Sequence, residues 1–206
     1  KLGWLLMCIA AVVFNTSNVY AQSETAKNKS AEADIAVDDA LGNEVSNKDS
    51  NLGKSGQSEM AEVDTIFDEI TQLSKDKRQK LRIIALAPHI VESLFEVGAG
   101  QQIIATTAHA DYPEAAKDIL QIGNYARLQI EKIVQLQPDV VIAWKTGNPG
   151  DDLARLKQYK IKVIYSNPTT LSQVGDELLM LGQLTGREDV AEPAASQYRE
   201  QLDTLK

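Results

Sequence analysis

The sequence predicts an α/β fold in which a parallel sheet is flanked by helices. The first observation is the apolar run Val140 to Ala143, which lies between Pro138 and a glycine-containing stretch and is typical of a strand buried on both faces. The second is that such runs alternate with helix-periodic segments after residue 81, which indicates crossover connections and therefore parallel strands. The third is the hydrophobic content, 43% of 206 residues, which is enough for one domain with a core.

The first 21 residues have the layout of a secretory signal peptide. A basic first residue is followed by an apolar stretch from Trp4 to Phe14 and by a small residue, Ala21, at the expected cleavage site. A spanning helix would need about 20 apolar residues. The sequence has one cysteine, Cys8, and it follows the bulky Met7, whereas a lipid-attachment site has a small residue there. We therefore expect Cys8 to be lost with the leader and the mature protein to be exported and free of cysteine.

Residues 22–80 are expected to form an acidic and polar spacer. No aromatic residue lies between Gln22 and Ile66, so most of this segment cannot bury enough apolar surface to offset its chain entropy and should be disordered. A short helix at 62–76 is favoured by apolar residues at helical spacing, namely Ile66, Phe67, Ile70 and Leu73.

The predicted binding lobe covers residues 81–186. Apolar runs predict strands at 82–87, 102–107, 139–144 and 161–166, and a short third strand at 119–123. Helical periodicity predicts helices at 90–98, 130–137, 152–159 and 170–186, the first of them ending at Gly98 or Gly100. A further helix begins after residue 187, with an apolar face of Val190, Ala194, Tyr198 and Leu202.

Ring side chains follow the predicted strands. Pro88 follows the first strand, His109 follows the second, and Trp144 ends the fourth, while Tyr125 lies in the loop after the short third strand. Because ligands bind beyond the carboxyl ends of parallel strands, these rings suit a large, flat, partly apolar ligand. No carboxylate pair, metal-spaced cluster or nucleophile with a base stands out. The sequence therefore favours binding, and no enzyme activity is expected.

The formal net charge of -8 argues against nucleic acid and anionic membranes as partners, since both are themselves negative.

From residue 82 onward the chain resembles a known family. The segments that carry this resemblance are "ALAPHIVESLFEVGAG", "HADYPEAA", "QIGNYARLQIEKIVQLQPDVVIAWKTGN" and "LARLKQYKIKVIYSNPTTL". They are similar to the periplasmic binding proteins of ABC importers for cobalamin, siderophores and haem, and most of all to the cobalamin-binding subgroup. The resemblance implies a Rossmann-like lobe of a two-lobed, class III binding protein. It also implies that residues 187–206 begin the long connecting helix and that the second lobe is missing from a fragmentary chain.

The same resemblance implies the function and the site. The protein would capture cobalamin, as transported ligand and not as catalytic cofactor, and deliver it to a membrane permease. The residues expected to contact the ligand are Pro88, His109, Tyr125, Trp144 and Gly147. The family usually has tyrosine where His109 stands and tryptophan where Tyr125 stands. Glu131 matches the carboxylate that pairs with permease arginines, and its place near a helix start suits a charge-assisted contact.

Other ligands and roles stay open at this point. A haem or an iron-siderophore complex is the alternative ligand, with His109 as a candidate iron ligand. The nearby cations Arg127 and Lys145 do not make a strong basic pocket for an anionic chelate. An enzyme related to metal-cluster chemistry would need cysteines or several ligand residues, and the chain has two histidines in all.

Each candidate residue also has a purely structural interpretation. Trp144 could pack against a helix, and Tyr125 could be an ordinary loop ring. Glu131 could simply favour the positive end of its helix. The remaining structural alternatives are a strand end at Pro88, a helix start at His89, a solvated turn at His109 and a tight turn at Gly147.

Overall fold

The computed structural model describes residues 52–205, with side chains from residue 61 onward. The expected signal peptide at 1–21, with Cys8, and the expected spacer up to residue 51 lie outside the described residues. Between residues 52 and 205, no helix is both long enough and apolar enough to cross a membrane.

Four strands form one parallel sheet at the centre of the molecule. They are β1 (Ile83–Ala85), β2 (Ile103–Thr106), β5 (Val140–Trp144) and β6 (Val163–Ser166), in the order β2-β1-β5-β6. Every neighbouring pair is parallel, and Trp144 at the end of β5 lies opposite Ser166 at the end of β6. The predicted fold class is confirmed.

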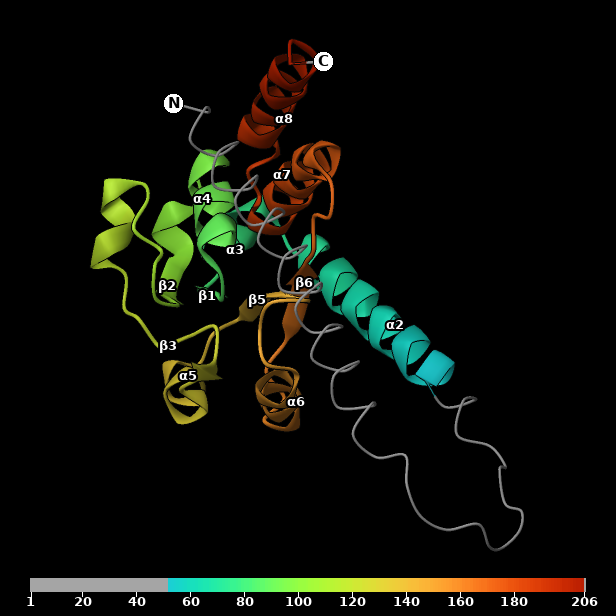
Figure 1. Ribbon diagram of the computed structural model, residues 1–206, viewed down its shortest axis with the longest axis vertical. Coiled ribbons are helices and arrows are strands. Elements are labelled where there is room, and N and C mark those ends of the chain that lie inside the picture. The colour runs from blue at the N-terminus through green and yellow to red at the C-terminus, as the bar shows by residue number, and fades with distance from the viewer. Residues whose placement is uncertain (1–51, 206) are drawn as a thin grey trace, which may run out of the picture.

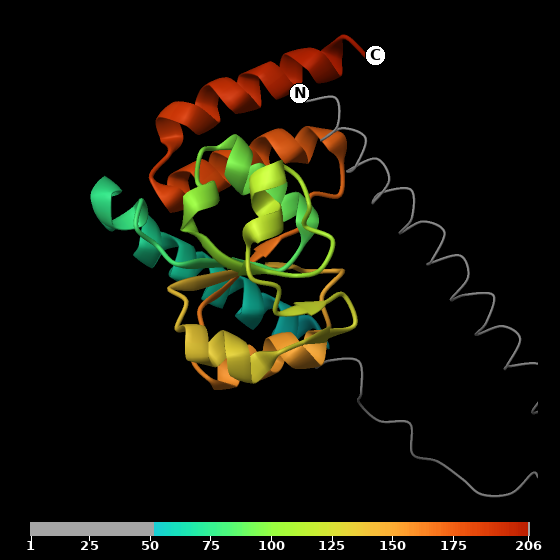
Figure 2. The same cartoon turned by 90° about the vertical axis from the view of Figure 1, so that its left-hand side faces the viewer.

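Helices cover both faces of this sheet (Figures 1 and 2). On one face lie α5 (Ile130–Leu136) and α6 (Gly150–Gln158); on the other lie α4 (Pro88–Glu96) and α7 (Leu171–Thr185), with α8 (Glu188–Asp203) packed on α7. Alternate residues of β5 enter the two cores: Val140 and Ile142 join one, Val141 and Ala143 the other. This is why the run is apolar throughout, since both faces of the strand are buried.

Local signals set the helix ends. Proline at the first position starts α4, which suits a residue that has no N–H to satisfy. Thr170 and Gln173 form a capping box at the start of α7, and Gly186, with φ +67°, ends that helix in the left-handed conformation. The four helices predicted within residues 81–186 therefore agree with the observed ones to within about two residues, the uncertainty usual for helix ends.

The connection from β2 to α5 is the part of the lobe that the sequence predicts least well. It contains a 3-10 turn (Glu114–Asp118) and a small antiparallel hairpin of β3 (Gly123–Asn124) and β4 (Arg127–Leu128). The short strand expected at 119–123 contributes a single parallel bridge, between Thr106 and Gln121. The hairpin was missed because each of its strands has only two residues.

The chain is ordered well before Leu81, which differs from the expected spacer at 22–80. Helix α2 (Leu52–Thr71) begins earlier than the short helix expected at 62–76, and it lies against β6 and α7 (Figure 1). Its stripe of Val63, Ile66 and Phe67 packs on the core, and Ile70 is 3% exposed. Two ion pairs, Glu62 with Lys157 and Glu69 with Lys162, join it to α6 and to the start of β6. Tertiary packing therefore stabilises a helix whose composition alone favours disorder.

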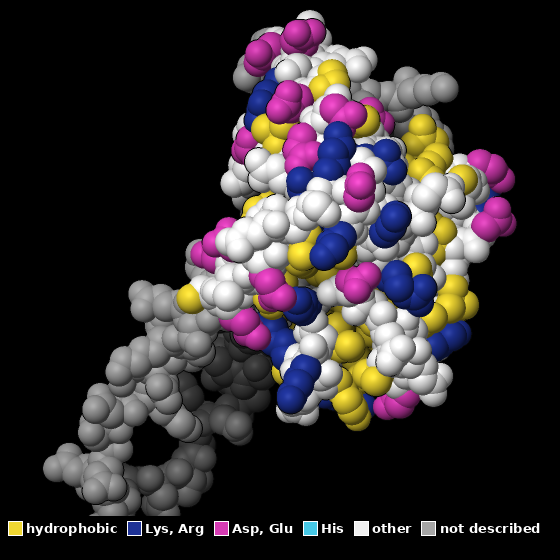
Figure 3. Space-filling view, turned by 180° about the vertical axis from the view of Figure 1, so that it is seen from behind, with side chains coloured by type: hydrophobic (Ala, Val, Ile, Leu, Met, Phe, Trp, Pro, Cys, Tyr) yellow, Lys and Arg dark blue, Asp and Glu magenta, His cyan; other side chains and the backbone are white. Residues whose placement is uncertain are grey.

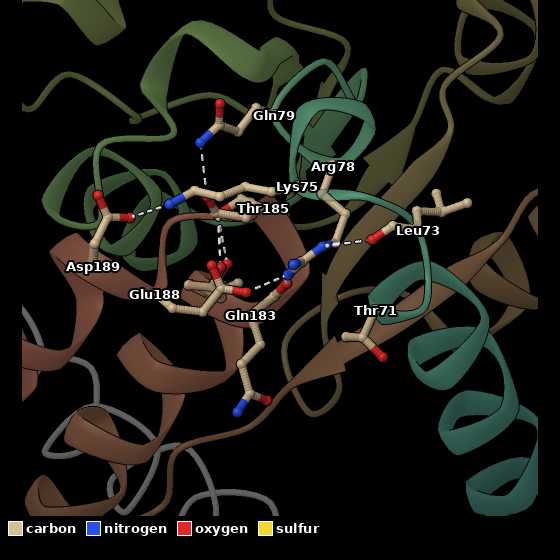
Figure 4. Close-up of polar contacts among 12 residues, drawn as sticks. Thr71, Leu73, Lys75, Arg78, Gln79, Gln183, Thr185, Glu188 and Asp189 are labelled. Atoms are coloured by element: carbon tan, nitrogen blue, oxygen red, sulfur yellow. Dashed lines mark hydrogen bonds and ion pairs between the residues drawn. The ribbon is translucent and has the colours of Figure 1, made fainter.

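A second element, α3 (Lys75–Arg78), fastens this segment to the turn between α7 and α8 (Figure 4). The Arg78 guanidinium contacts Glu188 at 2.5 Å and donates hydrogen bonds to the carbonyl oxygens of Gln183 and Leu73. Lys75 pairs with Asp189 at 2.9 Å, and the Gln79 amide donates to the Gly186 carbonyl at 2.8 Å. The residues from 61 to 80 thus belong to the folded unit.

The surface carries charges of both signs. On the face shown in Figure 3, Lys and Arg side chains are interspersed with Asp and Glu side chains and do not gather into one extended patch. An interspersed surface of this kind gives little long-range attraction for a highly charged partner.

Candidate ligand-binding edge

Three of the predicted site residues meet at the carboxyl edge of β1 and β5. Pro88 lies at the first position of α4, directly beyond β1, and Trp144 ends β5. Gly147 lies in the turn that follows Trp144. Pro88, Trp144 and Gly147 are all partly exposed.

The turn after β5 holds the Trp144 backbone rigidly. The Trp144 N–H donates to Oδ1 of Asn148 at 2.7 Å, and Nδ2 of Asn148 donates to the Leu86 carbonyl at 2.9 Å. Asn148 is buried, so its side chain ties the end of β5 to the end of β1. A Cβ on Gly147 would lie 1.8 Å from the Trp144 ring. Only glycine at 147 therefore allows the indole to lie over the turn.

The Trp144 ring is half-buried. It packs against the core beneath α4 and α7, and it meets the His89 ring edge to face, at 5.4 Å between ring centroids and 84° between planes. The structural alternative for Trp144 is therefore right for the buried part of the side chain, while the residue as a whole stays partly exposed. Edge-to-face contact is the favourable geometry for aromatic pairs.

A buried polar chain runs behind this tryptophan. Nε2 of His89 lies 3.3 Å from Oγ of Ser166, and Ser166 donates to Oε1 of Glu177 at 2.8 Å. His89, Ser166 and Glu177 are all less than a tenth exposed. Burial lowers the pKa of His89 to about 4 and raises the pKa of Glu177 to about 7, the Ser166 hydrogen bond acting in the opposite sense on Glu177.

These three residues do not have the arrangement of a hydrolase triad. In that arrangement the acid bonds to the histidine, which in turn activates an accessible serine. In this chain the acid bonds to Ser166 instead, and Ser166 is 2% exposed. Sequence analysis missed Ser166 and Glu177, although one signal was available: Glu177 lies within the buried stripe of α7, between Val174 and Leu181.

His109 and Tyr125 lie on the far side of the same edge, beyond β2. His109, with φ +71°, and Tyr125, 75% exposed, are both open to solvent. The Ala108 N–H donates to the Gly123 carbonyl at 2.9 Å, which places the hairpin that carries Tyr125 beside the turn that carries His109. The structure brings these two rings to the predicted edge but gives neither a ring contact with Trp144 among the described side chains.

An acidic pair, Glu92 and Asp111, is carried by the same elements as these rings, since Glu92 is on the helix that Pro88 starts and Asp111 is two residues after His109. Glu92 is one helical turn beyond Pro88 on α4 and is 8% exposed, and burial, followed by the negative charge of Asp111, raises its pKa to about 7. Oε2 of Glu92 is buried without a hydrogen-bond partner. The charge at this part of the edge is therefore negative or neutral.

Glu131 lies in the first turn of α5, and its side chain is 72% exposed. Its carboxylate accepts a hydrogen bond from Arg155 of α6 at 3.1 Å. A hydrogen bond from its own backbone N–H, together with the Arg155 charge, keeps its pKa below the ordinary value. Glu131 is therefore ionised at neutral pH and available at the surface.

Across the described residues, no group of three or more His, Cys, Asp or Glu side chains could hold a metal ion. His109, the candidate iron ligand of the sequence, therefore belongs to no such group among the described residues.

Known proteins share this fold and much of this sequence. A family model described as "Periplasmic binding protein" matches residues 83–206. A vitamin B12-binding protein of Vibrio campbellii is 42% identical over 125 residues, which are 61% of this chain and 46% of that protein. The chain thus spans about half the length of the curated relatives that it matches.

Solved structures agree with the sequence comparison. The crystal structure of a periplasmic vitamin B12 binding protein of Vibrio cholerae superposes with a TM-score of 0.59 at 35% identity, covering 62% of this chain and 50% of that one. A periplasmic heme binding protein of Vibrio cholerae superposes with a TM-score of 0.54 at 23% identity, covering 61% and 49%, and this similarity concerns the fold alone.

Proposed function

Because the chain belongs to the periplasmic binding protein family, we propose that it is the substrate-binding component of an ABC importer that captures cobalamin and delivers it to a membrane permease. The observation that carries this proposal is the preorganised Trp144 at the carboxyl edge of the sheet, in a chain that is 42% identical to a vitamin B12-binding protein. The protein acts by binding and release, with no covalent step.

The geometry of the edge supports a flat ligand. Trp144 is partly exposed at this edge and offers apolar ring surface, and Asn148 and Gly147 fix its position before any ligand arrives. A preformed ring contact loses little conformational entropy on binding. Tyr125 and His109, on the opposite side of the edge, provide further ring surface for the same ligand.

A haem or iron-siderophore complex is the second candidate ligand. The observation in its favour is His109, which is exposed at the same edge and is of a residue type that coordinates iron. The neighbouring carboxyl groups of Glu92 and Asp111 oppose this candidate, because haem propionates and most ferric siderophores are anionic, whereas cobalamin carries neutral amide side chains.

Glu131 is proposed as the contact with the permease. Its carboxylate is exposed and ionised, and Arg155, with which it forms an ion pair, is itself 44% exposed. Exposed ion pairs of this kind are weak, so the arginine of a partner protein can replace Arg155.

The unit delivered to the periplasm is proposed to start after a signal peptide at residues 1–21. A polar spacer would follow, and the folded lobe would end at residue 186. Residues 187–206 would begin a helix leading to a second lobe.

The test is calorimetric titration of cyanocobalamin, and separately of haemin, into the purified full-length protein with both lobes, because this lobe alone is expected to bind cobalamin weakly or undetectably. We expect saturable one-to-one binding of cyanocobalamin, and we expect Trp144→Ala to raise the Kd by about tenfold or more, because the ring contributes about 1.5–3 kcal/mol of apolar contact. Tyr159→Ala is the matched control, since Tyr159 is an exposed ring at the end of α6, on the opposite edge of the sheet.

Two outcomes would change the assignment. Binding of haemin without cyanocobalamin would move the function to the second candidate. Binding of cyanocobalamin with equal affinity by the parent and by a folded Trp144→Ala variant would remove Trp144 from the site. Far-UV circular dichroism of each variant distinguishes lost contact from lost folding.

A further inference from the structure

The buried chain of His89, Ser166 and Glu177 joins three elements behind the candidate site. His89 comes from α4, Ser166 from the end of β6 and Glu177 from α7. Ser166 and Trp144 are register partners on adjacent strands, so their side chains leave the sheet on the same face. Trp144 and the three polar residues therefore occupy one end of the core between the sheet and the helices α4 and α7.

The hydrogen bonds run in one direction along this chain. Ser166 has one hydroxyl proton, and that proton is donated to Glu177. The contact between His89 and Ser166 must then use the Nε2–H of the imidazole as donor. Glu177 thus orients Ser166, Ser166 selects the tautomer and orientation of His89, and the His89 ring meets the Trp144 ring edge to face.

This buried polar arrangement lowers the stability of the folded state. Oε2 of Glu177 is buried without a hydrogen-bond partner, and a carboxyl group held in such a place destabilises the folded state. Apolar side chains of similar volume usually replace buried polar groups without loss of stability, and often with a gain. Stability alone therefore does not explain why these three polar residues lie together.

We propose that His89, Ser166 and Glu177 are positioning residues, which hold the Trp144 ring in the orientation that receives the flat ligand. The proposal rests on the proposed function for the identity of that ligand. Asn148 fixes the backbone of Trp144, Gly147 lies against the indole, and the polar chain contacts the indole through His89. None of the three polar residues is exposed enough to form a large contact with a ligand.

Trp144 can report its own orientation. The chain contains two tryptophans, Trp4 and Trp144, so Trp4→Phe in the full chain leaves Trp144 as the single tryptophan. The measurements are the fluorescence emission maximum and the time-resolved anisotropy of Trp144 in the parent and in variants of the polar chain. These signals require no ligand, whereas a separate titration with cyanocobalamin measures affinity.

The decisive pair of variants is Glu177→Leu and Glu177→Gln. Leucine is apolar and cannot accept the Ser166 hydrogen bond, whereas glutamine keeps an acceptor oxygen and nearly the same shape. We expect Glu177→Leu to shift the emission of Trp144 and to enlarge its fast anisotropy decay. We also expect it to raise the Kd for cyanocobalamin about fivefold, within the range of coupling between contacting residues. Glu177→Gln should restore the parental values.

His89→Ala and Ser166→Ala should reproduce the loss, because each breaks the same chain at another link. Unchanged emission and anisotropy in a folded Glu177→Leu variant would overturn the positioning role, as would equal disturbance by Glu177→Gln. A failed proposed function would look different: the parent itself would not bind cyanocobalamin, while the fluorescence of Trp144 would still decide whether the polar chain orients the ring.

Discussion

Glu177→Gln should stabilise the folded chain at neutral pH and have almost no effect in mild acid. The Glu177 side chain is 7% exposed, and burial raises its pKa from 4.5 to about 7. The unfolded chain therefore releases this proton near pH 4.5, while the folded chain keeps it until about pH 7. Between these values the folded state binds more protons, so the free energy of unfolding falls as the pH rises through this window.

The magnitude follows from the two pKa values. A difference of about 2.5 corresponds to about 3 kcal/mol at about 1.4 kcal/mol per pKa unit. Glutamine has no proton to lose, so the variant escapes this penalty. The stability difference between variant and parent should be near zero at pH 4 and should approach about 3 kcal/mol at pH 8.

His89 adds an opposite dependence that both proteins share. Burial lowers its pKa from 6.5 to about 4, so stability is lost as the pH falls through this range. In the parent the two residues offset each other over the overlapping pH range. In Glu177→Gln only the His89 effect remains from this pair, and stability should rise with pH across the same range.

The assay is urea unfolding followed by far-UV circular dichroism at several values between pH 4 and pH 8. Glu96→Gln is the control, because Glu96 is an exposed carboxylate near the end of α4. A stability difference between Glu177→Gln and the parent that is the same at pH 5 and pH 8 would refute the reasoning, since Glu177 would then not hold a proton in the fold.

Three further substitutions test other parts of the structure. Gly147→Ala should displace the Trp144 ring and therefore shift its fluorescence emission. It should also lower the free energy of unfolding, measured with urea, by about 1–3 kcal/mol. Unchanged emission and stability would show that the turn adjusts without moving the ring. Arg78→Ala should lower the free energy of unfolding by about 2 kcal/mol, because it removes a charged contact with Glu188 and two hydrogen bonds. Lys75→Ala should lower it much less, and equal losses in the two variants would show that Arg78 is not the main contact between α3 and the turn before α8. Glu131→Gln should leave cyanocobalamin affinity unchanged and reduce uptake in a reconstituted importer, with Glu96→Gln as control, and changed affinity with normal uptake would refute the docking role.

The sheet and its helices could be predicted because their signals are local. The apolar run of β5 is continuous since both of its faces are buried, and the ends of α4 and α7 are marked by Pro88, Thr170 and Gly186. The position of Trp144 at the carboxyl edge followed from the strand alone. Parallel topology then brought Pro88 to the same edge.

The features that the sequence did not predict depend on contacts between residues that are far apart in the chain. Helix α2 has a polar composition, and what holds residues 61–71 is packing on β6 and α7 together with ion pairs to Lys157 and Lys162. The contact of His89 with Ser166 joins residues 77 positions apart, and no periodicity reports such a pairing. Sequence reasoning therefore placed Trp144 at the edge of the sheet but did not predict the polar groups behind it.

The placement of α2 along β6 also bears on self-association. A sheet edge with free N–H and C=O groups can pair with the strand of another molecule and start aggregation. At the β2 edge, the chain itself occupies this position, since Thr106 exchanges backbone hydrogen bonds with Leu120 and Ile122. At the other edge, β6 is shielded by α2, which α3 anchors to the turn before α8. A shortened chain that begins at β1 would lose that shield, so expression of this lobe as a monomer requires residues 61–80 as well.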